Sequence, residues 1–400
     1  MTRRRRLALA LAALVACGRA DASVEDTCSR ASSSAGASDR RRDATVDRFV
    51  VATLNARWLF DGVADVRASP YANGDASGAR THGRAIADVV RALDADVVVL
   101  TEAETCETLG WAANASGSGG YVVGVVPGTD TATMQQVGVL SRNASGGYVV
   151  GMVPGTDTAT MQQVGVLSRV DFAENLWRTN DRASYDASSS ACGTSTSVTS
   201  GVSKNVVARL RTPSGRYVSI IGAHLKANPT EPSSCAQREA QVEVLRALAK
   251  ARFDAGDAVM VIGDLNDYSD LHRDAGNNAP ISQCLKRLRD FDGDGIDELE
   301  EVGGLIAANE RYTWQSGSNR AKLDYILTSR SDMDVISARI RHDLVNSSVS
   351  DHFPLVAVVD VLSTRNVSRL LASTTTRGAT STSAVFAALL IAIVLSSYLR

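Results

Sequence analysis

Short apolar runs that contain β-branched residues recur along the chain and predict buried strands. They lie at residues 48–55, 96–100, 202–210, 216–224, 258–263, 324–328 and 355–359. Two longer segments, 82–93 and 236–253, repeat their apolar residues at helical spacing and predict amphipathic helices. This mixture of strands and helices predicts an α/β fold, with the folded domain at residues 46–362.

Residues that can carry chemistry stand at the ends of most of these strands. They are Asn55, Glu102, His224, Asp264, Asn266, Asp324, Asp351 and His352. Asp264 and Asn266 lie two positions apart on an extended strand end, so their side chains point the same way and can bind one ligand. Each residue alone is more often structural than functional, but together they predict a site. With no cysteine nearby, its hard oxygen ligands favour Mg²⁺, Mn²⁺ or Ca²⁺.

A duplication interrupts the chain after the second predicted strand. Residues 119–142 recur at 146–169 with a single change, Val125 to Met152, so the duplicated region spans 119–169 with a period of 27 residues. Repeat folds need three or more stacked units, which makes one insertion the better interpretation. We expect only one copy to take a strand position in the sheet, and the other copy to loop out.

The acidic segment 290–301 spaces its side chains as a calcium-binding loop does. Gly295 permits a sharp turn, although Ile296 is shifted by one position from the usual apolar site. The candidate ligands are Asp290, Asp292, Asp294, Glu298 and Glu301. The segment predicts structural Ca²⁺, with a bare acidic turn as the alternative, and neither interpretation is catalytic.

The beginning of the chain has the pattern of a secretory signal peptide. Basic residues 3–6 precede an uncharged run at 7–16 and a small-residue cleavage site, which predicts a signal peptide at 1–22. A lipoprotein cleavage site ending in Cys17 is the alternative. Residues 23–45 show no apolar period and predict a linker.

The end of the chain predicts a membrane anchor. A Ser/Thr-rich stalk at 363–383 precedes a hydrophobic tail at 384–400, whose apolar run is shorter than the roughly 20 residues needed to span a bilayer. A polar spacer before a short apolar tail is typical of a glycolipid (GPI) anchor signal. A short tilted membrane helix is the alternative. We expect a monomeric protein outside the cell or on its surface, attached to the membrane by this anchor.

The cysteines and glycosylation sequons fit the secretory pathway. Once the signal peptide is removed the remaining cysteines are odd in number, so at most two disulfides form. They are Cys28, Cys106, Cys192, Cys235 and Cys284. The sequence leaves the pairing open, and we favour Cys192 with Cys235 because both lie in loop-like stretches. Asn-x-Ser sequons occur at Asn114, Asn143, Asn346 and Asn366.

Six motifs in chain order resemble those of the endonuclease/exonuclease/phosphatase superfamily, which includes deoxyribonuclease I-like nucleases. The motifs are Thr-Leu-Asn55, Leu-Thr-Glu102, Ala-His224-Leu, Gly-Asp264-Leu-Asn266, Leu-Asp324-Tyr and Ser-Asp351-His352. Each is short and weak alone, but six in order are a strong signal. Thr101 stands where glutamine is commoner. The resemblance covers residues 48–361 and implies a four-layer α/β sandwich of two packed mixed β-sheets with outer helices.

The resemblance also implies an activity and a site. It implies a divalent-metal-dependent phosphodiesterase, most often a nuclease, that holds Mg²⁺ or Mn²⁺ through Glu102, Asn55 and Asp351. His352, oriented by Asp324, would be general base or phosphate contact, and Asp264 is the other candidate base. The catalytic set that it implies is His352, Asp264, Asn266, His224 and Asp324.

The substrate is less well determined. The net charge of −2 argues against binding nucleic acid through bulk charge, although a local basic cleft would not show in that sum. The basic residues next to the motifs could bind phosphate or be merely solvated, and they are Arg57, Arg178, Arg182, Lys204, Lys226 and Lys322. Nucleic acid is the favoured substrate. The alternatives are an inositol phosphate, a sphingomyelin-like lipid, or an inactive binding module on the same fold.

Overall fold

The computed structural model describes residues 39–366, except 40, 42, 64–68, 72, 114–120, 125–138, 143–148, 153–159, 161 and 196. The predicted signal peptide and tail, most of the linker and nearly all of the stalk lie outside these residues, as do Cys17, Cys28, Asn114 and Asn143. Within the described residues, no helix is both long and apolar enough to cross a membrane.

The larger sheet has six strands in the order β16-β17-β1-β2-β6-β5. In that order they are Met333–Ile340, Leu355–Val361, Arg48–Leu59, Val97–Ala103, Gln163–Ser168 and Val149–Met152. β1 and β2 run parallel, and Asn55 of β1 lies opposite Thr101 of β2. The two strands therefore carry Asn55 and Glu102 to the same edge of the sheet.

The second sheet has five strands in the order β12-β15-β11-β10-β9. In that order they are Leu299–Glu301, Asp324–Ser329, Ala258–Asp264, Tyr217–His224 and Asn205–Arg211. His224 at the end of β10 lies opposite Asp264 at the end of the parallel strand β11. Asp264 in turn lies opposite Asp324, the first residue of the antiparallel strand β15.

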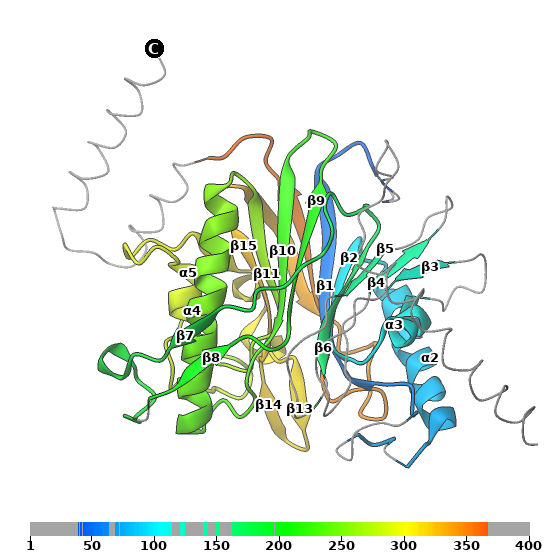
Figure 1. Ribbon diagram of the computed structural model, residues 1–400, viewed down its shortest axis with the longest axis horizontal. Helices are drawn as coiled ribbons and strands as arrows, with labels where there is room; N and C mark the ends of the chain where they lie inside the picture. The colour runs from blue at the N-terminus through cyan, green and yellow to red at the C-terminus, as the bar shows by residue number, and fades with distance from the viewer. Residues whose placement is uncertain are drawn as a thin grey trace, which may run out of the picture.

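The two sheets pack face to face and bury a shared apolar core. A Cβ atom built on Gly222 of β10 would meet Val164 of the first sheet and Val206 of the second, each at 2.8 Å, so only glycine fits where the sheets approach. Helices cover both outer faces (Figure 1). α2 (Ala76–Leu93) and α3 (Cys106–Ala113) lie beside the six-stranded sheet, and α4 (Pro232–Asp254) and α5 (Cys284–Arg289) beside the five-stranded one. This confirms the predicted four-layer sandwich.

Smaller elements connect these layers. They are the paired strands β13 (Trp314–Ser316) and β14 (Asn319–Ala321), the paired strands β7 (Arg182–Ser184) and β8 (Thr199–Gly201), and the 3-10 turns η1 (Ala187–Ser189), η2 (Val302–Leu305) and η3 (Ala308–Glu310).

Both long helices start earlier than their apolar period predicts, because capping residues precede that period. The Asp75 carboxylate accepts a hydrogen bond from the backbone N–H of Gly78 at the start of α2. The Glu231 carboxylate accepts from the backbone N–H groups of Ser233 and Ser234 in α4, where Pro232 takes the first turn.

The two copies of the duplication occupy different places. The second copy supplies β5 and β6 of the six-stranded sheet, where β6 pairs with β2. The first copy supplies β3 (Tyr121–Gly124) and β4 (Val139–Arg142), which pair only with each other in a two-stranded sheet. As predicted, a single copy takes the strand position next to β2.

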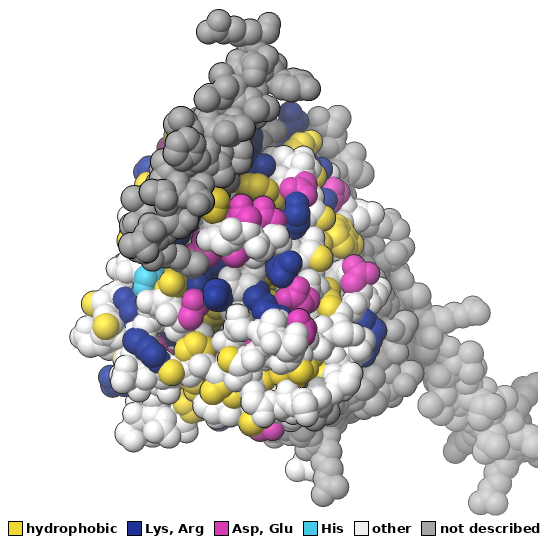
Figure 2. Space-filling view, turned by 90° about the vertical axis from the view of Figure 1, so that its left-hand side faces the viewer, with side chains coloured by type: hydrophobic (Ala, Val, Ile, Leu, Met, Phe, Trp, Pro, Cys, Tyr) yellow, Lys and Arg dark blue, Asp and Glu magenta, His cyan; other side chains and the backbone are white. Residues whose placement is uncertain are grey.

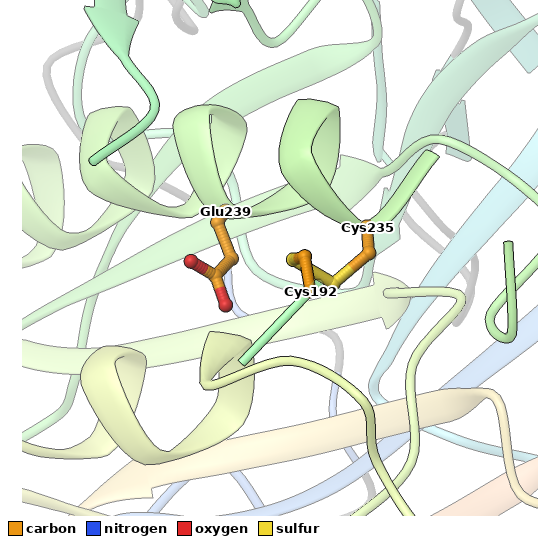
Figure 3. A group of neighbouring side chains, drawn as sticks. All are labelled: Cys192, Cys235 and Glu239. Atoms are coloured by element: carbon orange, nitrogen blue, oxygen red, sulfur yellow. A yellow bond between two sulfur atoms is a disulfide. The ribbon is translucent and has the colours of Figure 1, made fainter. Parts of the chain in front are cut away.

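A disulfide joins Cys192, in the loop between β7 and β8, to Cys235 in the first turn of α4. Figure 3 shows this bond with the side chain of Glu239 beside it, one turn further along the helix. The pairing that the sequence favoured is therefore present. Cys284 is a free, buried thiol at the start of α5.

The predicted linker is wrong at its C-terminal end. Asp39 forms a β-bridge with Val170. The Arg41 side chain is buried and its Nη1 donates hydrogen bonds to the carbonyl oxygens of Val46 and Arg48. The sequence shows no apolar period here because the segment is held by polar contacts.

Deleting residues 119–145, which removes the first copy, should leave the fold and its thermal midpoint nearly unchanged, because β2 keeps its partner β6. Thermal unfolding followed by circular dichroism tests this. The duplication offers a matched pair of controls, since Leu140 and Leu167 are equivalent positions. Leu167→Ala opens a cavity in the core and should cost about 2–5 kcal/mol, and we expect a smaller cost for Leu140→Ala because β4 pairs outside the six-stranded sheet. Equal costs would mean that both copies contribute to the core.

Candidate active site

A cavity of about 710 Å³ lies where the ends of the two parallel strand pairs meet. The predicted site residues that line it are Asn55, Glu102, Lys204, His224, Asp264, Asn266 and His352. They come from both sheets, so the packing of the sandwich assembles the cavity.

Asn55 and Glu102 form the wall from the six-stranded sheet. The Asn55 Oδ1 accepts a hydrogen bond from the backbone N–H of Arg57, which fixes the orientation of the amide. Its Nδ2 therefore donates to Glu102 Oε1 and to Asp264 Oδ2, both at 3.0 Å. In this orientation Asn55 positions two carboxylates. The resemblance implied instead that Asn55 helps to hold the metal, and its amide oxygen is used here by the backbone N–H of Arg57.

Glu102 is held in a strained conformation with φ of 62°, which is uncommon for a residue with a side chain. Its Oε2 accepts a hydrogen bond from the backbone N–H of Trp58. Burial raises the pKa of Glu102, against the hydrogen bond from Asn55 and the charge of Lys204. The environment therefore disfavours this carboxylate as a bare anion.

Asp264 stands at the centre of the opposite wall. It follows Gly263, which has φ of 142° and whose Cβ, if present, would lie 2.0 Å from the carbonyl oxygen of Ala223. Only glycine allows β10 and β11 to approach so closely just before the carboxylate. Burial, and next the charge of Asp324, raise the pKa of Asp264 to about 7.

His352 is paired with Asp324. Its Nδ1 lies 2.7 Å from Asp324 Oδ2, and its Nε2 lies 4.0 Å from Asp264 Oδ2. Burial by itself would lower the pKa of His352, but the Asp324 carboxylate overcomes that effect and raises it to about 10. The imidazole is thus cationic at neutral pH, and its Nε2 faces the cavity side where Asp264 lies.

His224 and Asn266 complete the wall. Burial holds the pKa of His224 well below its ordinary value, so this imidazole is neutral, and its Nε2 lies 3.7 Å from Asp264 Oδ2. Asn266 has φ of 50°, and its Nδ2 donates to the carbonyl oxygen of Leu225. The second Nδ2 hydrogen of Asn266 remains for a ligand.

Asp351 lies beside this group without lining the cavity, and its charge adds to the raised pKa of both Glu102 and His352. Its carboxylate accepts a hydrogen bond from Trp314 Nε1, it lies 3.7 Å from Arg57 Nε, and it does not line the cavity. Asp351 also lies next to His352, so the two side chains of the Ser-Asp-His motif point to different partners. The structure does not bring Asp351 together with Asn55 and Glu102 at the cavity wall.

The basic residues that the sequence suggested as phosphate contacts do not all lie at the cavity. Lys204 lines the cavity and its Nζ donates to Gln162 Oε1. Arg57 donates to the carbonyl oxygen of Ser347, outside the cavity. Arg178 and Arg182 line a second cleft. Of the two weaker candidates, Lys226 lines the cavity, whereas Lys322 is buried and lies over the Tyr325 ring.

Sequence reasoning missed several residues of the site. Trp314, Tyr268 and Gln162 line the cavity but stand in no motif. Ser350 belongs to the Ser-Asp-His motif, but the sequence alone assigned it no function. Its Oγ donates to the carbonyl oxygen of Asn55 and accepts from the backbone N–H of His352, so it fixes the turn before β17 against β1 of the same sheet.

The acidic loop keeps part of its predicted ligand set. The carboxylates of Asp290, Asp292 and Asp294 lie within 4.8 Å of one another. Glu298 accepts a hydrogen bond from the backbone N–H of Phe291, and burial raises its pKa to about 8. Glu301 does not belong to the loop, because its carboxylate binds Arg289 and Ser269 inside the fold. Structural calcium stays a prediction for the other four residues.

The cavity is suited to a divalent cation. Glu102 and Asp264 share the amide of Asn55, and within the described residues no lysine or arginine forms an ion pair with either. Two adjacent carboxylates without such a counter-ion are a donor set of hard oxygens, which Mg²⁺ and Mn²⁺ prefer. The residues therefore fit the metal, and Glu102 is the residue best placed to hold it.

Comparison with known proteins shows the family of the chain. The sequence profile of the Endonuclease/Exonuclease/phosphatase family matches residues 52–352, more than half of the chain, and the chain belongs to this family. Members of the family are metal-dependent phosphoester hydrolases. No curated protein is similar enough to count as a match.

Several solved structures resemble the protein. An endonuclease/exonuclease/phosphatase from Beutenbergia cavernae is 16% identical, with a TM-score of 0.45, and the match covers 79% of this chain and 72% of that one. TDP2 from C. elegans is 14% identical, with a TM-score of 0.42, covering 78% and 75%. The human Nocturnin catalytic domain is 17% identical, with a TM-score of 0.42, covering 82% and 97%.

Asp324→Asn should lower the pKa of His352 from about 10, because burial then acts without the carboxylate that raises this pKa most. NMR titration of the imidazole measures this.

The Asp324–His352 pair stabilises the folded state fully below about pH 6.5. That stabilisation is lost as the pH rises through about 10, so the variant should show a flatter dependence of unfolding free energy on pH over this range.

Asp351→Asn is the matched control, since this neighbouring carboxylate is more exposed and contributes least to the pKa of His352. An unchanged His352 pKa in Asp324→Asn would contradict the assignment of the pair.

Proposed function

We propose that the protein is a divalent-metal-dependent phosphodiesterase that hydrolyses the phosphodiester bonds of nucleic acid. The observation that carries this proposal is the placement of a cationic imidazole, His352, opposite the carboxylate of Asp264 in one cavity with Glu102. Phosphodiester hydrolysis needs charge neutralisation on the phosphate and a base for the attacking water. His352 can supply the first and Asp264 the second.

Each residue has a distinct part in the proposed reaction. Glu102 holds the metal, which when bound neutralises charge on the phosphate oxygens and favours deprotonation of water. His352 carries its proton on Nε2 and donates it in a hydrogen bond to a non-bridging phosphate oxygen. Asp324 keeps the imidazole cationic and oriented.

Asp264 is the proposed general base. Its pKa of about 7 is close to the operating pH, where a base is most effective, whereas His352 already carries its proton. Asn266 and the neutral His224 would donate further hydrogen bonds to the phosphate, where negative charge increases in the transition state. Of the two bases that the sequence left open, we therefore propose Asp264.

The choice of nucleic acid over another phosphoester rests on the surroundings of the cavity. Lys204 lines its wall, and the aromatic rings of Trp314 and Tyr268 line it too. Aromatic rings next to a cation are the combination on which nucleotide bases stack while their phosphates are held. We also propose that the protein acts outside the cytosol, since the Cys192–Cys235 disulfide is typical of an oxidising compartment.

His352→Ala should reduce the hydrolysis of plasmid DNA and of bis-p-nitrophenyl phosphate by on the order of 10²- to 10³-fold or more in kcat. Substrate and metal binding should remain largely intact. Glu102→Ala should instead raise the Mg²⁺ concentration that is needed for half-maximal activity. Steady-state kinetics over a Mg²⁺ titration distinguish the two effects.

His272→Ala is the control, because this histidine lies outside the cavity. Near-normal hydrolysis by His352→Ala would refute the mechanism. Cleavage of sphingomyelin but not of DNA by the unaltered protein would reject nucleic acid as the substrate. No hydrolysis of any phosphoester by the folded protein would favour a binding module.

A further inference from the structure

A second cleft, of about 520 Å³, adjoins the active-site cavity. It lies against the β7–β8 hairpin and the segment that leads from β8 to β9. Ser203 and Gln237 line both the cleft and the cavity, so these residues form a wall that the two spaces share. A ligand that fills the cavity and continues past this wall enters the second cleft.

The walls of this cleft are fixed by polar contacts. Arg178 Nη2 donates to the carbonyl oxygens of Val202 and Ser203, both at 3.1 Å. The buried Asn205 exchanges hydrogen bonds with the backbone of Thr179 and also donates to Val202. These contacts hold the segment from β8 to β9 against the segment that precedes β7, and both line the cleft.

The disulfide fixes the hairpin from the other side. Cys192, between β7 and β8, is bonded to Cys235 in α4 (Figure 3). Gln237, two residues further along α4, is the helix residue that lines both spaces, and its Nε2 lies 3.5 Å from Ser200 Oγ. The hairpin is thus attached to the same helix that borders the cavity, which suits a preformed binding surface.

The cleft carries net positive charge at its lining. Among the described residues, Arg178 and Arg182 line it together with a single carboxylate, that of Asp181. Burial lowers the pKa of Arg178 to about 10, so it is still cationic at neutral pH. Lys204 follows Ser203 directly and lines the cavity, so basic side chains continue from the cavity into the cleft.

On the side of the protein that Figure 2 shows, the described surface carries basic and acidic side chains together. Figure 2 shows the side that carries α4 and the β7–β8 hairpin, and on its described part Lys and Arg side chains alternate with Asp and Glu. This agrees with the nearly neutral net charge of the chain. Attraction for a polyanion on this side is therefore concentrated in the cleft, not spread over the surface.

We propose that the second cleft binds the phosphate backbone of the nucleic-acid strand next to the bond that is cleaved in the cavity. This inference rests on the proposed nuclease function and adds that the substrate is a polymer, not a mononucleotide or a small phosphoester. Arginine contacts to phosphate position a strand without reading its sequence. The cleft therefore favours longer substrates and carries no base preference of its own.

Arg182 is the residue to test, because Arg178 also supports the backbone at Val202 and Ser203. Arg182→Gln removes the charge and keeps a donor for the Thr199 carbonyl that Arg182 binds. Arg182→Lys restores the charge. Arg211→Gln is the matched control, since this exposed arginine lies at the opposite end of β9 from the cleft.

The test uses three substrates. They are a dinucleotide, a single-stranded oligonucleotide of about 12 nucleotides, and bis-p-nitrophenyl phosphate.

The unaltered protein should cleave the oligonucleotide with a higher kcat/KM than the dinucleotide. Arg182→Gln should lower kcat/KM on the oligonucleotide about tenfold, mainly through KM, and Arg182→Lys should recover most of it. The dependence of log KM on log salt concentration should weaken by about 0.7 in Arg182→Gln, as for the loss of one phosphate contact to a single strand. Hydrolysis of bis-p-nitrophenyl phosphate should be unchanged, as should every rate of Arg211→Gln.

Two results would overturn this inference and leave the proposed function standing. One is equal kcat/KM of the unaltered protein on the dinucleotide and the oligonucleotide. The other is an Arg182→Gln variant that loses as much activity on bis-p-nitrophenyl phosphate as on the oligonucleotide, since that loss would come from a disturbed fold or cavity. Hydrolysis of the small diester without any cleavage of the oligonucleotides would instead refute the nuclease function, and this inference with it.

Discussion

The buried contact between the Asp324 carboxylate and the His352 imidazole is the interaction on which the site depends. Both side chains are withdrawn from water, and an isolated charge in either position would be strongly destabilising. The two charges are tolerated because they lie together. Three elements fix that contact: the β11–β15 register places Asp324, Ser350 holds the backbone of His352, and Thr313 accepts from the backbone N–H of Asp324.

The same contact takes up the charge of His352. His352 is paired with Asp324, so it compensates Asp264 only across 4.0 Å, and among the described residues no lysine or arginine forms an ion pair with Glu102 or Asp264. The raised pKa values of Glu102 and Asp264 have the same physical origin, which is burial of carboxylates without sufficient counter-charge. A divalent cation would supply that charge. The strained backbone at Glu102 is consistent with a residue that is positioned for a ligand and not for its own stability.

Much of the fold was predictable because most of its central strands are buried on both faces and form unbroken apolar runs, several of them with a polar residue at one end. Side-chain partners were less predictable. The orientation of the Asn55 amide depends on the backbone N–H of Arg57, and no spacing rule reveals that contact. Asp351 and His352 are neighbours in sequence but point to different partners, since adjacent side chains in extended chain point apart. Glu301 fits the spacing of a calcium loop. Its carboxylate is instead paired with the buried Arg289 inside the fold.

The two irregular features of the chain are the duplication and the disulfide-bonded hairpin, and neither carries a residue of the proposed chemistry. The duplication ends with β6 and the hairpin follows it, whereas the residues of the proposed chemistry come from β1, β2, β10, β11, β15 and the turn before β17. Both features nevertheless reach the cavity wall, through Gln162 on one side and Ser203 and Lys204 on the other. Connections of this kind can change length without moving the strand ends that hold the reacting groups. We therefore propose that these connections, and not the strand ends, determine which shape of substrate fits.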